Sequence, residues 1–185
     1  MKAVLASRNA HKARELERLL PGWQIEVLDA DDYPPETGTT YYENARTKAD
    51  FARGRAPAAA WVVGEDSGIE VAGLDGGPGV RSARSAAGDE VGWMLRALEG
   101  VHGEARRARY VSELVALGSD GEELRGTGTL AGRIALAPGG AEGFGFDPVF
   151  IPEGEERTVA ELGDEWKSQN SHRARAAREL LRQAG

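Results

Sequence analysis

The sequence contains no cysteine, which excludes disulfide bonds, thiolate metal ligands and a cysteine nucleophile. No apolar run approaches the ~20 residues that a membrane-spanning helix needs. The first residues also lack the charged-then-apolar pattern of a secretion signal. We therefore expect a cytoplasmic protein with no membrane partner, whose metal ligands are oxygen or histidine.

An excess of positive charge is lacking too, because the formal net charge is -7. This acidic balance argues against a nucleic-acid partner, although a local basic site can still bind a phosphate group. With 185 residues, 41% of them hydrophobic, the chain is long enough to bury a substantial core. We expect a single domain that covers residues 1–185.

The first motif is a polar loop between an expected strand over residues 1–6 and an expected helix over 13–20. Its sequence is Ser7-Arg8-Asn9-Ala10-His11-Lys12. Unpaired amide groups and the positive end of the helix dipole attract anions at such a position. The loop is therefore either an ordinary capped turn or a phosphate site, and Arg8 and Lys12 supply the positive charge for the second.

The second motif is acidic. A short buried strand over 61–64 is expected to end in the turn Glu65-Asp66-Ser67-Gly68, before another strand over 69–72. Asp and Gly favour turns for backbone reasons alone, so the turn needs no function. Adjacent carboxylates at a strand end beside a phosphate loop instead indicate an Mg²⁺ site, where one carboxylate can accept a proton from water. Glu36, in a Pro-rich loop over 29–39, is a candidate for a further ligand.

The remaining pattern alternates helices and strands. Thr40 and Glu43 form a capping box for a helix that ends near Gly54. Further expected elements are a helix over 90–98, strands over 108–117 and 123–136, and a last helix over 170–182. The arginines of the last helix are typical of a solvated face, since its alanine and leucine positions define a buried side.

A third group of motifs lies in the C-terminal half, at Gly143-Phe144-Gly145-Phe146-Asp147-Pro148 and Lys167-Ser168-Gln169-Asn170-Ser171-His172-Arg173. Aromatic rings between glycines either pack in a core or leave a face open for stacking on a base. Asp, His and Arg side chains can read the polar edge of that base. The co-occurrence of these motifs with a phosphate loop and an acidic turn favours a nucleotide site.

These motifs closely resemble the inosine triphosphate pyrophosphatase family, which hydrolyses non-standard purine nucleoside triphosphates. The resemblance covers nearly the whole chain, through residues 7–12 with Glu15, 36–38, 43–45, 65–68, 77–79 with 82–84, 143–150 and 171–173. It implies an α/β fold in which an elongated mixed β-sheet is flanked by helices around a central nucleotide cleft. It also implies a homodimer.

The resemblance implies Mg²⁺-dependent cleavage of ITP, dITP and XTP to the monophosphate and pyrophosphate, which cleanses the nucleotide pool. Asp66 would be the general base, and Glu36 with Glu65 or Asp66 would hold the metal. The residues implied for the phosphates and ribose are Ser7, Arg8, Asn9, Ala10, His11, Lys12, Ser67 and Lys167. Those implied for the base are Phe144, Gly145, Phe146, Asp147, His172 and Arg173.

Base choice also follows from donor chemistry. Arg173 can only donate hydrogen bonds, so it favours the 6-oxo group of hypoxanthine or xanthine over the 6-amino group of adenine. Two positions depart from the family pattern: Glu65 stands where bacterial members have a second Asp, and Trp166 replaces an acidic residue.

Alternative functions are a pyrophosphatase of the Maf type, whose opening Arg-Arg pattern is absent, and a nucleotide sensor without turnover. The intact Glu36 and Asp66 argue against the sensor, since a pure binder gains little from carboxylates near polyphosphate. A dinucleotide-dependent oxidoreductase is disfavoured, because no Gly-x-Gly-x-x-Gly motif follows the first strand.

Overall fold

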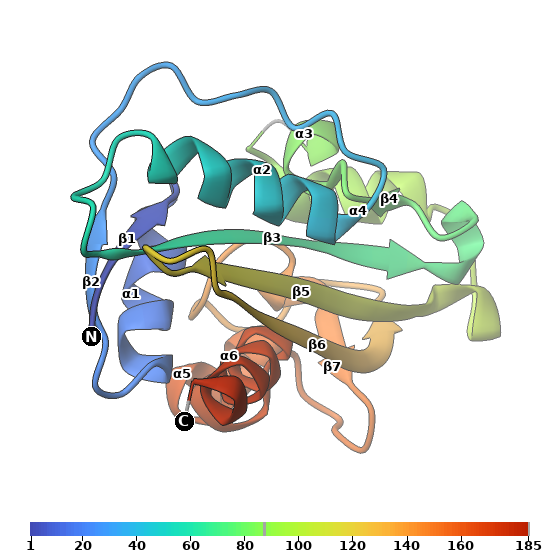
Figure 1. The fold of residues 1–185 in the computed structure, drawn as a ribbon. Helices are drawn as coiled ribbons and strands as arrows, with labels where there is room; N and C mark the ends of the chain where they lie inside the picture. The colour runs from blue at the N-terminus through green and yellow to red at the C-terminus, as the bar shows by residue number, and fades with distance from the viewer. Residues whose placement is uncertain (87, 185) are drawn as a thin grey trace. The chain divides into compact units, whose positions relative to one another are not determined.

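In the computed structural model, which describes residues 1–86 and 88–184, the chain forms a mixed seven-stranded sheet flanked by helices (Figure 1). The strand order is β2-β1-β3-β5-β6-β7, and β4 pairs with β3. The strands are β1 (Lys2–Ala6), β2 (Gln24–Val27), β3 (Trp61–Val71), β4 (Pro78–Gly79), β5 (Arg107–Leu117), β6 (Glu123–Ile134) and β7 (Phe150–Pro152). The expected sheet with flanking helices is confirmed.

The helices are α1 (Ala10–Leu19), α2 (Tyr41–Arg53), α3 (Ser82–Ala86), α4 (Glu90–Ala97), α5 (Val159–Asn170) and α6 (His172–Gln183). Three short 3₁₀ turns complete the order, at Ala72–Leu74, Gly103–Arg106 and Asp147–Val149. Within residues 1–86 and 88–184, none of these helices has the length and hydropathy that spanning a membrane requires.

The chain divides into two compact units. Unit 1 comprises Met1–Asp66, Ser112–Gly128 and His172–Gly185, and unit 2 comprises Ser67–Val111 and Thr129–Ser171. The strands β3, β5 and β6 each contribute residues to both units. The expectation of a single domain stays a prediction, and each unit is described by itself.

Unit 1 contains β1, β2, α1, α2 and α6. Asn9 caps α1 through its side-chain oxygen, which accepts from the backbone N–H groups of His11 and Lys12. The helix therefore begins three residues before the predicted start. The Thr40 and Glu43 capping box at α2 is present as predicted. The strand β1 is parallel to both β2 and β3.

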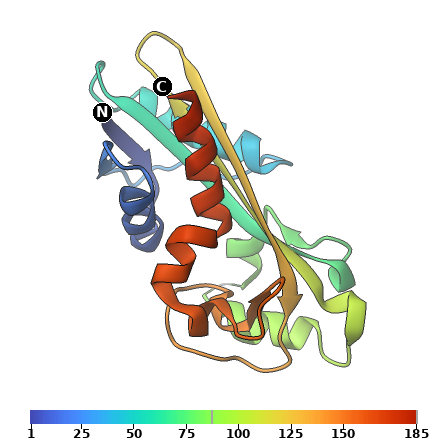
Figure 2. The same ribbon diagram turned by 90° about the horizontal axis from the view of Figure 1, so that it is seen from below.

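Glycines let two helices of unit 1 approach the strands closely. A Cβ atom on Gly126 or Gly128 would lie 2.0 or 1.9 Å from a backbone oxygen of α6, which runs beside β6 (Figure 2). On β3, a Cβ atom on Gly64 would lie 1.9 Å from the Ala45 backbone oxygen of α2. The alanines of α2, Ala45, Ala49 and Ala52, are fully buried against this surface.

We expect Gly64→Ala to lower the free energy of unfolding by about 1–3 kcal/mol, because the new methyl group forces α2 away from β3. Gly54→Ala is the matched control. Gly54 has a right-handed helical conformation, and a Cβ atom there comes no closer than 3.8 Å to a neighbour, so it should change stability by less than about 0.5 kcal/mol. Urea unfolding measures both. Equal stability of the two variants would contradict the close packing.

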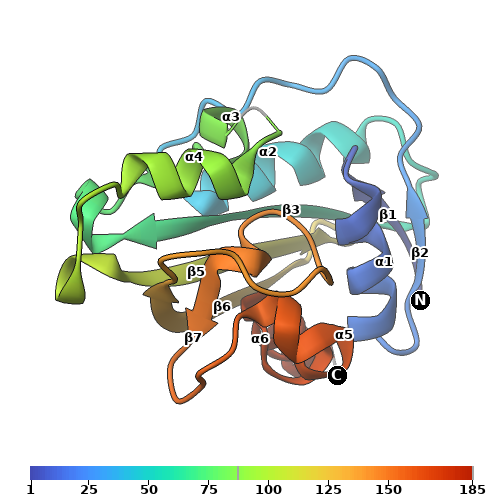
Figure 3. The ribbon, with the colours of Figure 1, turned by 180° about the vertical axis from the view of Figure 1, so that it is seen from behind.

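Unit 2 has its own core, built around Ile69, Met94, Leu98 and Phe150. Its helices α3 and α4 lie side by side (Figure 3). The sequence reasoning missed α5, although Thr158 and Glu161 form a capping box at its start. Gly163 interrupts this helix with φ 84 and ψ 176, which breaks the apolar repeat that would have revealed it.

The predicted unit of strand, acidic turn and strand is wrong. Residues 61–71 form one continuous strand, so Glu65 and Asp66 lie in its middle. Asp and Gly are typical of turns when their side chains satisfy the local backbone. Here both carboxylates bind side chains from other elements, which removes that reason for a turn.

Candidate functional site

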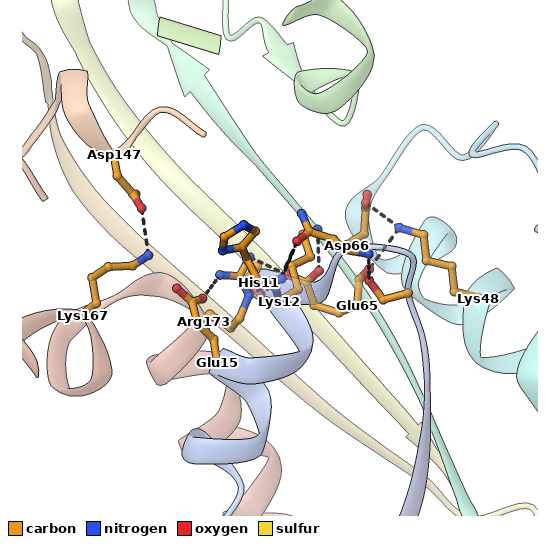
Figure 4. A network of polar contacts seen from close by, with 12 residues as sticks. His11, Lys12, Glu15, Lys48, Glu65, Asp66, Asp147, Lys167 and Arg173 are labelled. Carbon is orange, nitrogen blue, oxygen red and sulfur yellow. Dashed lines mark hydrogen bonds and ion pairs between the residues drawn. The ribbon is translucent and has the colours of Figure 1, made fainter. Parts of the chain in front are cut away.

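The carboxylates of Glu65 and Asp66 point to opposite faces of β3, because successive side chains of a strand alternate. Each gathers its own cluster of polar partners in unit 1 (Figure 4). We call these the Glu65 cluster, formed by Lys12, Glu15, Glu65, Ser112 and Arg173, and the Lys48 cluster, formed by Glu36, Asn44, Lys48 and Asp66.

In the Glu65 cluster the two oxygens of Glu65 have different partners. Oε2 lies 2.6 Å from Lys12 Nζ. Oε1 accepts from Ser112 Oγ at 3.2 Å, and from Nε and Nη2 of Arg173 at 3.2 and 3.1 Å. Arg173 also pairs with Glu15 through Nη1. Glu65 and Arg173 are each only 2% exposed, so the ion pair at the centre of this four-charge network is buried, while Lys12 and Glu15 are half-buried.

Burial alone would raise the pKa of Glu65, but Lys12 and Arg173 outweigh it and hold that pKa well below its ordinary value. Burial likewise opposes the charge on Arg173, while Glu65 and Glu15 raise its pKa. Both groups are therefore ionised at neutral pH.

In the Lys48 cluster a single ammonium group contacts three oxygens. Lys48 Nζ lies 3.1 Å from Asp66 Oδ1 and 3.0 Å from the backbone oxygen of Glu65, and it forms an ion pair with Glu36 Oε1. Asn44 donates from Nδ2 to Asp66 Oδ2 at 3.0 Å. The carboxylates of Glu36 and Asp66, 30 residues apart in the sequence, thus meet at one cation.

Burial raises the pKa of Asp66 above its ordinary value, against the opposing effects of Lys48 and Lys12. Burial acts to lower the pKa of Lys48, but the carboxylates of Asp66 and Glu36 raise it by more than burial lowers it. The pKa of Lys48 therefore lies above its ordinary value, and the ammonium group is charged at neutral pH.

The helix α2 positions this cluster. Asn44 and Lys48 are one turn apart and share a helix face with the buried Ala45, Ala49 and Ala52. Asn44 also accepts from the backbone N–H of Gly38 at 2.9 Å, which fastens the loop that carries Glu36. The sequence reasoning assigned no role to Asn44 or Lys48. Their position on an otherwise alanine-lined face is the signal that could have found them.

The loop at residues 7–12 forms a capped turn with a basic side chain at each end. Ser7 Oγ accepts from the Asn9 N–H at 3.1 Å. Arg8 donates to the backbone oxygen of Asp31 and lies over the Tyr33 ring, 4.9 Å from its centroid. Lys12 turns inward to Glu65. Among the loop residues predicted to hold phosphate, Lys12 thus forms an ion pair with Glu65 of β3.

The predicted base residues of unit 2 form a separate cluster around Asp147. Its Oδ2 accepts from Lys167 Nζ at 2.8 Å and from the Phe144 N–H at 2.9 Å, and its Oδ1 accepts from Tyr110 at 3.2 Å. Figure 4 shows the contact between Lys167 and Asp147. Lys167 Nζ also lies 4.7 Å from the centroid of the half-buried Phe144 ring. Gly145 permits the sharp turn here through its φ of 65.

Other predicted site residues have different surroundings. Phe146 is 6% exposed and its ring packs edge-on against Trp93, which makes it a core residue of unit 2. Ser67 is half-buried at the unit 2 end of the acidic motif. His172 is buried in the first turn of α6. The prediction of a solvated arginine face on α6 is wrong for Arg173, because Glu15 and Glu65 supply carboxylates inside the protein.

Unit 2 also has an open cavity of ≈ 630 Å³, lined by residues of β3, β5 and β6 and by neighbouring turns. None of the predicted site residues lines it. Its charged residues include Glu70 and Arg109, which pair with each other at 2.6 Å, and Glu104 and Arg107, which pair at 2.5 Å. These exposed pairs balance each other and favour no particular ligand.

Within residues 1–86 and 88–184, no three His, Asp or Glu side chains converge as a complete metal cage. The carboxylates of Glu36 and Asp66 nevertheless lie close together at Lys48, and each can supply only oxygen ligands to a metal ion. Mg²⁺ is commonly bound by one or two carboxylates, with water and substrate phosphates as its other ligands. The two carboxylates therefore fit Mg²⁺ as ligands. The carboxylate of Glu65 does not join them, because it points into the Glu65 cluster.

Comparison with known proteins identifies relatives along the full chain. The model of the Ham1 family matches residues 3–183. The dITP/XTP pyrophosphatase of Exiguobacterium sp. is 43% identical over 189 residues, which cover 97% of this chain and 95% of that protein. The dITP/XTP pyrophosphatase of Opitutus terrae is 40% identical over 197 residues, which cover 97% of each.

A solved structure gives the same result for the fold. The HAM1 protein from Coxiella burnetii superposes with a TM-score of 0.83 and is 32% identical in sequence. The match covers 100% of this chain and 98% of that one.

Proposed function

The chain belongs to the Ham1 family, and we propose that it hydrolyses ITP, dITP and XTP to the monophosphate and pyrophosphate. The activity is supported by relatives at 40–43% identity that are named dITP/XTP pyrophosphatases. The observation that carries the chemistry is that the carboxylate of Glu36, from a loop, and that of Asp66, from the middle of β3, meet at the ammonium group of Lys48.

We propose Mg²⁺ as the metal and Glu36 with Asp66 as its protein ligands. When bound, the ion neutralises charge on the phosphate oxygens as bonds to phosphorus change. Glu65 is a weaker candidate for a ligand than the sequence indicated, because its carboxylate already binds Lys12, Ser112 and Arg173.

The remaining chemistry needs positioning and charge more than covalent help, since phosphoryl groups react by in-line displacement. Asp66 accepts the proton of the attacking water, for which it has to be ionised, and a cation beside its carboxylate favours the ionised form. Lys12 and Arg8, on the loop that begins α1, supply the positive charge for the phosphates.

We propose Asp147 and Phe144 as the residues that select the base, because Lys167 holds the carboxylate in place beside the ring. Phe146 and Arg173 are weaker candidates than the sequence indicated, because Phe146 packs in the core of unit 2 and Arg173 pairs with Glu15 and Glu65. The homodimer remains a prediction from the family resemblance, and the cytoplasmic location remains a prediction from the sequence.

The test is product analysis with Mg²⁺ across ITP, dITP, XTP, GTP, ATP and UTP, separating pyrophosphate from orthophosphate. We expect monophosphate and pyrophosphate from ITP, dITP and XTP, with little product from ATP. Orthophosphate release would contradict the proposed bond cleavage. Preference for UTP would support the Maf type, and tight binding without product would support the sensor.

A further inference from the structure

The ammonium group of Lys48 lies where a metal ion held by Glu36 and Asp66 has to bind. Its Nζ contacts one oxygen of each carboxylate and also the backbone oxygen of Glu65 (Figure 4). Oxygens of this kind are the ligands that Mg²⁺ prefers. A divalent cation that approaches both carboxylates therefore competes with Lys48 for the same oxygens.

We propose that Lys48 occupies the cation position in the nucleotide-free protein, so that the divalent metal binds well only when a triphosphate gives Lys48 a new partner. The inference rests on the metal site of the proposed function. Without nucleotide, the positive charge of Lys48 repels the metal at short range and neutralises one of two facing carboxylates, which would otherwise repel each other.

The side chain of Lys48 is suited to such an exchange. It is only 13% exposed. If the ammonium group moved away from the two carboxylates without a new anion to bind, its charge would lie unpaired in a poorly solvated place. A triphosphate supplies that anion, and the four-carbon stem of lysine lets the ammonium follow it. Lys12 is not equivalent, because its described ion pair is with Glu65, whereas the described ion pairs of Glu36 and Asp66 are with Lys48.

The test is Mn²⁺ binding to the nucleotide-free protein, followed by electron paramagnetic resonance of the free ion, in wild type and in Lys48→Met. We expect the variant to bind Mn²⁺ at least about tenfold more tightly, since a neighbouring positive charge is gone. Arg46→Met is the matched control. It removes the same charge from the same helix, but Arg46 pairs with Asp50 and Glu123 instead, so its Mn²⁺ affinity should stay within about twofold of wild type.

Tripolyphosphate is then added as the anion. It should tighten Mn²⁺ binding more in wild type than in Lys48→Met, because only the wild type has an ammonium group to displace. Unchanged or weaker Mn²⁺ binding by Lys48→Met would overturn the proposal, as would equal tightening by Arg46→Met. Circular dichroism checks folding, and Lys48→Gln, which keeps a donor, replaces the methionine variant if that unfolds. Because turnover is not measured, a failure here is distinct from a failure of the proposed reaction.

Discussion

Replacing Asp66 with asparagine is expected to lower kcat for XTP by about 10²–10⁴-fold, while the nucleotide still binds. The substitution keeps the shape of the side chain and an oxygen that can accept from Asn44. It removes the base that takes the proton from water, together with the negative charge that pairs with Lys48. Coupled detection of pyrophosphate gives kcat, and calorimetry with a non-hydrolysable triphosphate gives the affinity.

Asp50→Asn is the control for this loss. Asp50 is exposed on the same helix as Lys48, and its carboxylate pairs with Arg46. Its removal should leave kcat within about twofold of wild type, since exposed pairs contribute little. A kcat within tenfold of wild type for Asp66→Asn would refute its assignment as the base and leave the buried network as a structural feature only.

The sequence predicts local features of this site well. The capping box at Thr40 and Glu43 depends on residues three apart, and the structure confirms it. The strand β1 and the polar loop after it likewise follow from a short apolar run that ends in cap residues. Contacts of this range are decided by neighbouring side chains and the adjacent backbone, which a pattern records directly.

The partners of Glu65 and Asp66 are decided at longer range. Arg173 pairs with Glu65 across 108 residues and with Glu15 across 158, so no local pattern separates it from the exposed arginines of α6. The same long-range pairing kept Glu65 and Asp66 in a continuous strand instead of a turn. Lys48 was missed for a related reason, because its role depends on a loop and a strand that only the fold brings to α2.

The second large effect concerns stability. We expect Glu65→Gln to lower the free energy of unfolding at pH 7 by about 3–5 kcal/mol, because removing one member of a buried ionic network leaves its partners without a counter-charge. Lys12 loses the carboxylate with which it pairs, and Arg173 loses one of its two described carboxylate partners and keeps Glu15. The control is Glu104→Gln, whose carboxylate pairs with Arg107 on the exposed surface, and which should cost no more than about 1 kcal/mol. Similar urea-unfolding curves for both variants would contradict a stabilising role for the buried network.

The pH dependence of this difference tests its electrostatic origin. Lys12 and Arg173 hold the pKa of Glu65 below its ordinary value in the folded protein. Ionisation of Glu65 therefore stabilises the fold fully above the unfolded-state pKa of about 4.3, and this contribution is lost as the pH falls toward the lower folded-state pKa. We expect the advantage of wild type over Glu65→Gln to be constant from pH 8 to about pH 5.5 and to shrink below pH 4.3. An advantage that does not change between pH 7 and pH 3 would mean that shape and hydrogen bonding, and not charge, make Glu65 necessary.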